Sequence, residues 1–258
     1  MHFSSINIGK KFFNTYLKDK TNIVIVEIGS LDVNGSLRQF CSQENKYIGV
    51  DFAKGNNVDV VLKNPYKLPF KDNSIDVCIS SSCFEHSEFF WLLFSEIQRI
   101  LKPNGIFYLN APSNGPFHRY PVDCYRFYPD SGIALQNWGR KNNYKTLLLE
   151  SFIAKKHLGV WNDFVGIFIK DKKFAKNYPN RIQDKFKKYN NGVLFNSKIF
   201  SRFSFLMQDQ KFGFYQLALL LLSFPVMIRS NLLYFLRNNI KKRANKNIEI
   251  NQRKIYQN

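Results

Sequence analysis

The chain has 258 residues, of which 45% are hydrophobic and 16% aromatic, and it carries a formal net charge of +19. This composition excludes wholesale disorder and is sufficient for one large α/β domain with an appendage. The four cysteines form no CxxC pair and no short apolar run follows a basic start, so the sequence predicts a reduced, cytoplasmic protein and argues against a disulfide framework.

The predicted elements begin with a helical segment over residues 1–21. Short β-branched runs then alternate with helical patterns, as a series of βαβ units requires. Strands are predicted over residues 22–29, 46–52, 58–62, 75–81 and 105–112. Apolar residues at helical spacing predict a helix between the last two, capped by Ser87 and stopped by the KPNG of residues 102–105. A helix over 131–142 and two antiparallel strands over 144–154 and 163–170 complete a doubly wound sheet, with a domain boundary near residue 171.

A glycine turn follows the first predicted strand, in the stretch VEIGSLDVNGSLR of residues 26–38. Gly29 allows a tight turn and Gly35 allows the next helix to start close to the sheet, where its N-terminal N–H groups are free. Asp51 ends the second strand about twenty residues later, where a carboxylate can bind ribose hydroxyls. NAD, FAD and S-adenosylmethionine all fit this pattern. The dinucleotide pattern GxGxxG has a middle glycine beside the pyrophosphate, and no glycine lies between Gly29 and Gly35. The sequence therefore favours a ligand without a pyrophosphate.

Four motifs stand in one register and together resemble class I S-adenosylmethionine-dependent methyltransferases across residues 22–170. They are VIVEIGSLDVNGSLR, YIGVDF, LPFKDNSIDVCISSSCFEH and EIQRILKPNGIFYLNAPS. The resemblance implies a Rossmann-like seven-stranded sheet with a reversed last hairpin and helices on both faces. It also implies that S-adenosylmethionine is the cofactor and S-adenosylhomocysteine the product.

The resemblance further implies roles for single residues. Glu27 and Gly29 would lie at the methionine end, Asp51 would hold the ribose, and the loop of Lys67 and Leu68 would lie beside the adenine. Lys63 and Asn64 stand where the family often has an acidic residue, so backbone groups are expected to contact the adenine. The full set expected at the cofactor is Glu27, Gly29, Ser30, Gly35, Asp51, Phe52, Lys67, Leu68, Ser81 and Glu85.

The stretch GPFHRYPVDCYRFYPDSG, residues 115–132, is rich in functional groups and too proline-broken for a helix interior. His118 and His86 each follow a strand of the predicted sheet on its carboxyl side, where open α/β folds bind ligands. We therefore predict His118, Asp123 and His86 as catalytic candidates. The predicted acceptor-binding residues are Arg119, Tyr120, Tyr125 and Arg126.

Two simpler interpretations of this stretch stay open. Asp123 and Arg126, three residues apart, could merely pair with each other, and His86 could hold a loop by hydrogen bonds. Methyl transfer from a sulfonium requires alignment and exclusion of water, and a base helps when the acceptor is a hydroxyl. It requires no metal, so no metal site is expected.

The H-x-x-P-x-D-x-x-R-F run of residues 118–127 and the last strand of residues 161–170 resemble a narrower group of methyltransferases. These are encoded in bacterial surface-polysaccharide gene clusters and include enzymes thought to make the O-methyl phosphoramidate group of capsules. This resemblance implies O-methylation of a small, anionic acceptor, expected to be nucleotide-linked.

Residues 171–258 hold 18 lysines and arginines against 4 acidic residues, whereas residues 1–170 hold 20 against 15. We expect a mainly helical extension here. Its apolar run over residues 217–228 is shorter than the roughly 20 residues that span a bilayer. The segment 212–258 is therefore a helical lid, a homodimer element or a peripheral contact with an anionic membrane. RNA methylation with the basic region as an anchor is the alternative function, although no RNA-binding module is recognisable.

Overall fold

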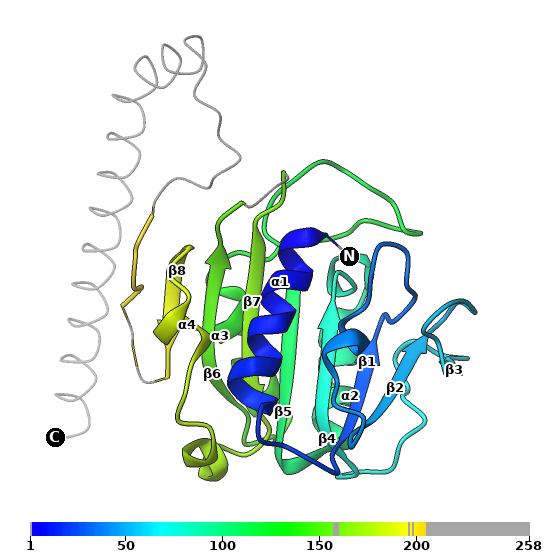
Figure 1. Cartoon of the computed structure of the whole chain (residues 1–258). Coiled ribbons are helices and arrows are strands. Elements are labelled where there is room, and N and C mark those ends of the chain that lie inside the picture. Colours follow the sequence, from blue (N-terminus) through cyan, green and yellow to red (C-terminus); the bar gives the residue numbers. More distant parts are fainter. Residues whose placement is uncertain (1, 157–159, 196, 198, 205–258) are drawn as a thin grey trace, which may run out of the picture. The chain divides into compact units, whose positions relative to one another are not determined.

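The computed structural model describes residues 2–156, 160–195, 197 and 199–204 (Figure 1). The contacts divide the chain into one compact unit up to Asp209 and a second from Gln210. The lid, dimer and membrane hypotheses for residues 212–258 lie outside the described residues. In the described part of the chain, no helix is long and apolar enough to cross a membrane.

One eight-stranded sheet runs through the first unit, with strand order β3-β2-β1-β4-β5-β7-β6-β8. Strands β1 to β5 are parallel to their neighbours, and β7 pairs antiparallel with both β5 and β6. This confirms the predicted Rossmann-like sheet with its reversed last hairpin and adds an eighth strand. The strands are β1 (Val24–Ile28), β2 (Lys46–Asp51), β3 (Val60–Val61), β4 (Ile75–Ser81), β5 (Leu101–Pro112), β6 (Leu147–Ala154), β7 (Asp163–Ile169) and β8 (Tyr189–Leu194).

Helices cover both faces of this sheet, with α1 in front of it and α2 and α3 behind it in Figure 1. Ile8 and Phe12 of α1 belong to one core cluster with Tyr108, while Phe94 of α2 packs on Phe168 in the other. The central strands are therefore buried on both sides, as their continuous apolar runs require. The helices are α1 (Phe3–Phe12), continued by a π turn (Phe13–Leu17), α2 (Phe90–Ile100), α3 (Ser131–Lys141) and α4 (Ile182–Lys185), with 3₁₀ turns at Leu37–Phe40, Phe84–His86 and Lys172–Asn177.

The helix expected after Gly35 was a wrong prediction, because only the 3₁₀ turn Leu37–Phe40 forms there. Of the residues in that turn only Leu37 is buried, so it has no apolar stripe to hold a longer helix on the sheet. Helix α1 packs over this position instead: a Cβ added at Gly9 would lie 2.3 Å from Leu37. The start of α2 also shifts, from Ser87 to Phe90, because Ser87 closes the 3₁₀ turn before it.

The residues after 171 continue the first unit, so the contacts place the end of that unit at Asp209 and not near residue 171. The segment from 171 to 204 was also expected to be mainly helical, and it is not. Strand β8 pairs with β6, and buried Glu150 of β6 ties three elements together. Its carboxylate accepts hydrogen bonds from the hydroxyl of Tyr16 (2.7 Å) and the backbone N–H groups of Ile182 (2.7 Å) and Gln183 (3.1 Å).

Replacing Glu150 with leucine is expected to destabilise the protein by roughly 3 kcal/mol, because three buried donors lose their acceptor. Urea unfolding followed by circular dichroism measures this free energy. The matched change at exposed Glu44, Glu44→Leu, should stay within about 0.5 kcal/mol of the parent. Equal stability of the two variants would show that Glu150 does not hold the extension to the sheet.

Candidate active site

Glu27 lies buried near the carboxyl end of β1, beside a brace formed by Asn57. The side-chain amide of Asn57 is 3.0 Å from Glu27 Oε2, 2.9 Å from the carbonyl oxygen of Ser30 and 2.9 Å from Ser36 Oγ. Asn57 has a φ of 68°, in the left-handed region that asparagine tolerates better than most residues. Asn57 was not predicted as a site residue from the sequence, where its only signal is an asparagine pair in the loop between β2 and β3.

The turn at Gly29 makes close contact with the loop that follows β4. Gly29 has a φ of +75°, and a Cβ added to it would lie 2.5 Å from Cys83 Cβ. Its N–H donates to the carbonyl oxygen of Val50 at 3.0 Å, which fixes the turn against β2. Glycine is therefore required here both by backbone conformation and by space. The contact brings the β1 turn next to the segment that carries Glu85 and His86.

Asp51, at the end of β2, is also buried and holds the same turn from the other side. Its Oδ2 accepts the N–H of Leu31 and its Oδ1 accepts the N–H of Ala53, both at 3.1 Å. Each oxygen keeps a second lone pair, so the carboxylate can still accept hydroxyl donors. Phe52 follows with 55% of its surface exposed beside this carboxylate.

The loop expected beside the adenine is tied to α2. The N–H of Leu68 donates to Glu96 Oε2 at 2.9 Å, and its carbonyl oxygen accepts from Arg99 Nη2 at 2.9 Å. Leu68 itself is buried, whereas Lys67 is exposed and its N–H donates to the carbonyl oxygen of Asn64. The backbone groups expected to contact the adenine are thus already used within the protein.

Among the described residues, several buried polar atoms at or beyond the carboxyl ends of β4 and β5 have no hydrogen-bond partner. They are Ser81 Oγ, Ser113 Oγ and Glu85 Oε2, together with Ser30 Oγ in the β1 turn. Buried polar groups in native proteins nearly always have partners, so such a cluster fits a polar ligand. Burial raises the pKa of Glu27 to about 7 and that of Glu85 to about 8.

The loop between β5 and α3 is organised around Asp123. Its carboxylate accepts the N–H of His118 at 2.7 Å and two hydrogen bonds from Arg126, at 2.6 Å from Nη1 and 2.8 Å from Nη2. The Arg126 guanidinium lowers the pKa of Asp123 to about 2. The pairing of Asp123 with Arg126 that the sequence left open is therefore present. The two Nη groups of Arg126 also donate to the carbonyl oxygens of Tyr125 and Pro116, which leaves little of the guanidinium for an acceptor.

The two predicted histidines lie against each other although they come from different strands. The ring centroids of His86 and His118 are 4.9 Å apart, in an edge-to-face arrangement. Trp161 flanks them, with its ring 4.9 Å from that of His118 and 4.7 Å from that of His2. Trp161 was predicted from the sequence only as part of a strand motif, not as a residue of the site.

Part of the chain is similar to known methyltransferases. Residues 9–109 match the family model described as a methyltransferase domain. Residues 9–109 thus resemble a methyltransferase domain. The chain is 33% identical over 94 residues to an uncharacterized methyltransferase of Mycolicibacterium paratuberculosis, a match that covers 34% of this chain and 36% of that protein. It is also 44% identical over 87 residues to an uncharacterized methyltransferase of Mycobacterium tuberculosis, covering 31% and 34%. The chain thus matches about a third of the length of these curated relatives.

The fold has a solved counterpart in the 1,6-didemethyltoxoflavin-N1-methyltransferase of Burkholderia thailandensis, whose crystal structure contains 1,6-didemethyltoxoflavin and S-adenosylhomocysteine. The TM-score is 0.51 at 13% identity, over 66% of this chain and 79% of that one. This likeness shows that the chain shares the Rossmann-like α/β fold of that enzyme.

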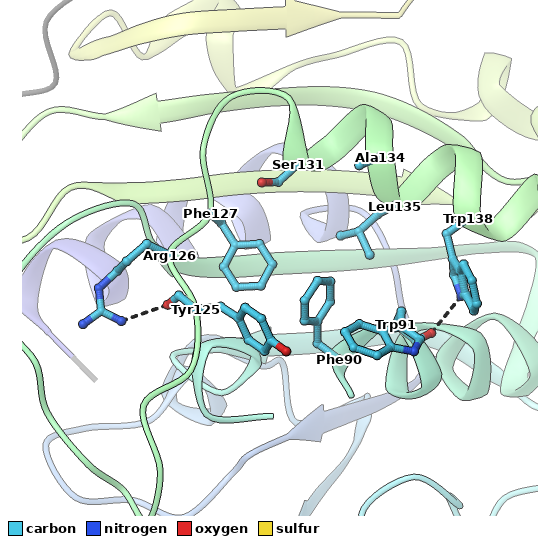
Figure 2. Close-up of a pocket in the computed structure, with 9 residues that line it drawn as sticks. All are labelled: Phe90, Trp91, Tyr125, Arg126, Phe127, Ser131, Ala134, Leu135 and Trp138. Carbon is cyan, nitrogen blue, oxygen red and sulfur yellow. Dashed lines mark hydrogen bonds between the residues drawn. The ribbon is translucent and has the colours of Figure 1, made fainter. Parts of the chain in front are cut away.

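A cavity of about 310 Å³ is lined by residues of α2, α3 and the loop between β5 and α3. Figure 2 shows the rings of Phe90, Tyr125 and Phe127 grouped together at this cavity, while Arg126 points away from them. Ring centroids are 4.9 Å apart for Phe90 and Tyr125 and 5.1 Å for Phe90 and Phe127. The Tyr125 hydroxyl donates to the carbonyl oxygen of Glu88. Of the predicted acceptor residues, Tyr125 and Arg126 are therefore held within the protein, whereas Arg119 and Tyr120 are exposed.

Raising the pH is expected to weaken the ligand-free protein through Glu27. Burial raises the folded-state pKa to about 7 from 4.5, so the folded state binds more protons than the unfolded state between these values. The contribution of Glu27 to the free energy of unfolding is fully present below about pH 4.5. It is lost as the pH rises to 7, and the loss is on the order of 3 kcal/mol. Urea unfolding between pH 5 and 8 should show a shallower decline for Glu27→Gln than for the parent. Parallel declines would place the titrating group elsewhere.

Proposed function

We propose that the protein transfers the methyl group of S-adenosylmethionine to an oxygen atom of a small acceptor. One observation carries this proposal: the β1 turn with Glu27 and Asp51 lies against the loop that leads to the histidine pair. A cofactor-binding edge and a group able to take a proton are thus joined within one methyltransferase domain. The contact between Gly29 and Cys83 is the junction of the two parts.

On the cofactor side, the buried acids and the unpartnered polar atoms fit a zwitterionic ligand with a ribose. Asp51 would accept the ribose hydroxyls, and Glu27 and Glu85 would face the cationic part of the ligand. When bound, the cofactor supplies an electrophilic methyl group on a sulfonium. Gly29, which has no side chain, would keep the β1 turn packed on Cys83 and so hold the cofactor side next to the loop after β4.

On the acceptor side, the hydroxyl would lie against the imidazoles of His86 and His118, where its proton is removed. Desolvation lowers the pKa of His86, which keeps this ring neutral and able to take a proton. Asp123 would act as a positioning residue, since its carboxylate accepts the N–H of His118 and two hydrogen bonds from Arg126. The side chains of Arg119 and Tyr120 are exposed and would contact the rest of the acceptor.

For the acceptor we propose an anionic, nucleotide-linked precursor of a capsule or surface polysaccharide, with a sugar hydroxyl or a phosphoramidate as the methylated group. Support comes from the resemblance of the 118–127 run to enzymes of that kind and from the exposed guanidinium of Arg119 on the same loop. Arginine binds phosphate and carboxylate groups through paired N–H donors.

Calorimetry with S-adenosylhomocysteine tests the cofactor half, and release of S-adenosylhomocysteine in a screen of nucleotide-linked sugars and phosphoramidates tests the acceptor. We expect micromolar binding of the cofactor product and turnover with at least one anionic acceptor. Absence of cofactor binding by the folded protein would overturn the methyltransferase proposal. Binding without turnover on any anionic acceptor would overturn the acceptor class alone.

A second candidate function is methylation of RNA, and one structural observation favours it. A groove of about 510 Å³ between α1 and α4 is lined by several lysines. Phosphate contacts release counterions, so RNA affinity should fall steeply with salt. The protein would then retain RNA at about 50 mM salt and release it by about 200 mM, the range over which such contacts weaken. This result would favour RNA over the small acceptor as the substrate. The lysines are Lys11, Lys155, Lys185, Lys187 and Lys188.

A further inference from the structure

We propose that Glu85, His86 and His118 form a binding site for a divalent transition-metal ion of the Zn²⁺ class. One potential ligand atom from each of the three side chains lies within 4.8 Å of the other two. His86 Nε2 is 3.7 Å from Glu85 Oε1. Two imidazoles and a carboxylate are a ligand set that zinc and its first-row neighbours prefer, whereas Mg²⁺ and Ca²⁺ prefer oxygen ligands alone.

The second nitrogen of each imidazole already has an acceptor. His86 Nδ1 contacts the carbonyl oxygen of Val122, and His118 Nδ1 is 3.3 Å from the carbonyl oxygen of Pro116 and 3.4 Å from Asp123 Oδ2. An imidazole that donates its Nδ1–H in this way keeps its Nε2 lone pair for a ligand. Metal-bound histidines commonly have such a carbonyl or carboxylate partner behind them.

Glu85 supplies an observation that is independent of the histidines. Its side chain is 1% exposed, and its Oε2 has no hydrogen-bond partner in the part of the chain that the structure describes. A buried carboxylate oxygen without a partner is costly, and a bound cation compensates that cost. The backbone of Glu85 also fixes the loop of the other ligand, because its carbonyl oxygen accepts the N–H groups of Cys124 (2.8 Å) and Tyr125 (3.2 Å). The site is therefore preorganised across two segments that are distant in sequence.

Three protein ligands leave coordination positions open for an outside oxygen. This inference adds to the proposed acceptor site, because an acceptor hydroxyl bound to the ion loses its proton more readily. The proton passes to solvent, and the oxygen forms its bond to the methyl carbon as the sulfur–carbon bond breaks. In that case the imidazoles hold the ion and do not themselves accept the proton.

Metal binding can be tested without any acceptor. Untagged full-length protein, freed of metal with a chelator, is dialysed against micromolar Zn²⁺ and analysed by elemental mass spectrometry, and Co²⁺ absorption reports the geometry. We expect one ion per chain. His86→Ala, His118→Ala and Glu85→Gln should each weaken Zn²⁺ binding on the order of 100-fold or more, and Asp123→Asn about 10-fold, as loss of an outer partner does.

The matched control is His2→Ala, which removes the other histidine in the described part of the chain and should keep the ion. Circular dichroism checks that each variant is folded, and Glu85→Gln preserves volume if an alanine variant unfolds. Failure of the parent to bind Zn²⁺ or Co²⁺ would overturn the site, as would equal affinity in the three ligand variants and the parent. Titration with S-adenosylhomocysteine of the parent and of the His86→Ala and His118→Ala variants tests the cofactor side separately, because neither histidine is assigned to the cofactor. Loss of the metal site and failure of the methyltransferase proposal therefore give different results.

Discussion

The His118→Ala variant is expected to lose about 100- to 1,000-fold in turnover while its affinity for S-adenosylhomocysteine stays within about twofold of the parent. The ring of His118 lies 4.9 Å from that of His86, on the acceptor side of the junction at Gly29 and Cys83. Its removal takes away the group that receives the proton or holds the ion, and none of the contacts around Asp51 depends on it. Turnover and calorimetry on one preparation give both quantities.

The Asp123→Asn variant tests whether Asp123 positions His118 or takes part directly in the reaction. Asparagine keeps an oxygen for the N–H of His118 but loses the charge that pairs with Arg126, so we expect a smaller loss of turnover, about 10-fold, with a shifted pH profile. Asp76→Ala is the matched control, because Asp76 lies at the amino end of β4, where it binds Lys102 and the N–H of Val24. A loss of cofactor affinity in His118→Ala equal to its loss of turnover would show that the acceptor side is wrongly placed.

The positions of the first seven strands along the chain could be predicted because each buried strand is a short apolar run with a turn signal at its end. The reversed hairpin followed from the family resemblance and is confirmed by the pairing of β5 with β7. Strand β8 could not be predicted in the same way, since its residues YNNGVL lack an alternating pattern. It forms because the edge of β6 is open and Glu150 holds α4 beside it.

The residue types of the candidate site could be predicted from the sequence, but the contacts between those residues could not. Strand-end positions brought His86 and His118 into one region, but their contact depends on how the loop after β5 folds back to the carbonyl oxygen of Glu85. Asn57 could not be found because its role depends on a left-handed backbone beside Glu27, which no local pattern indicates. The missing helix after Gly35 likewise depends on α1, a distant segment that fills its place.

Asp51→Ala is expected to weaken the binding of S-adenosylhomocysteine about 100-fold, through two effects. The ribose hydroxyls would lose an ionised acceptor, and the N–H groups of Leu31 and Ala53 would lose the oxygens that hold the turn. Asp51→Asn keeps one of these acceptors and should lose less. Asp76→Ala, an acid removed from the opposite end of the sheet, should bind as the parent does. Calorimetry at one pH compares the three variants. Unchanged affinity in Asp51→Ala would place the ribose away from β2 and would contradict the proposed direction of the cofactor across the sheet.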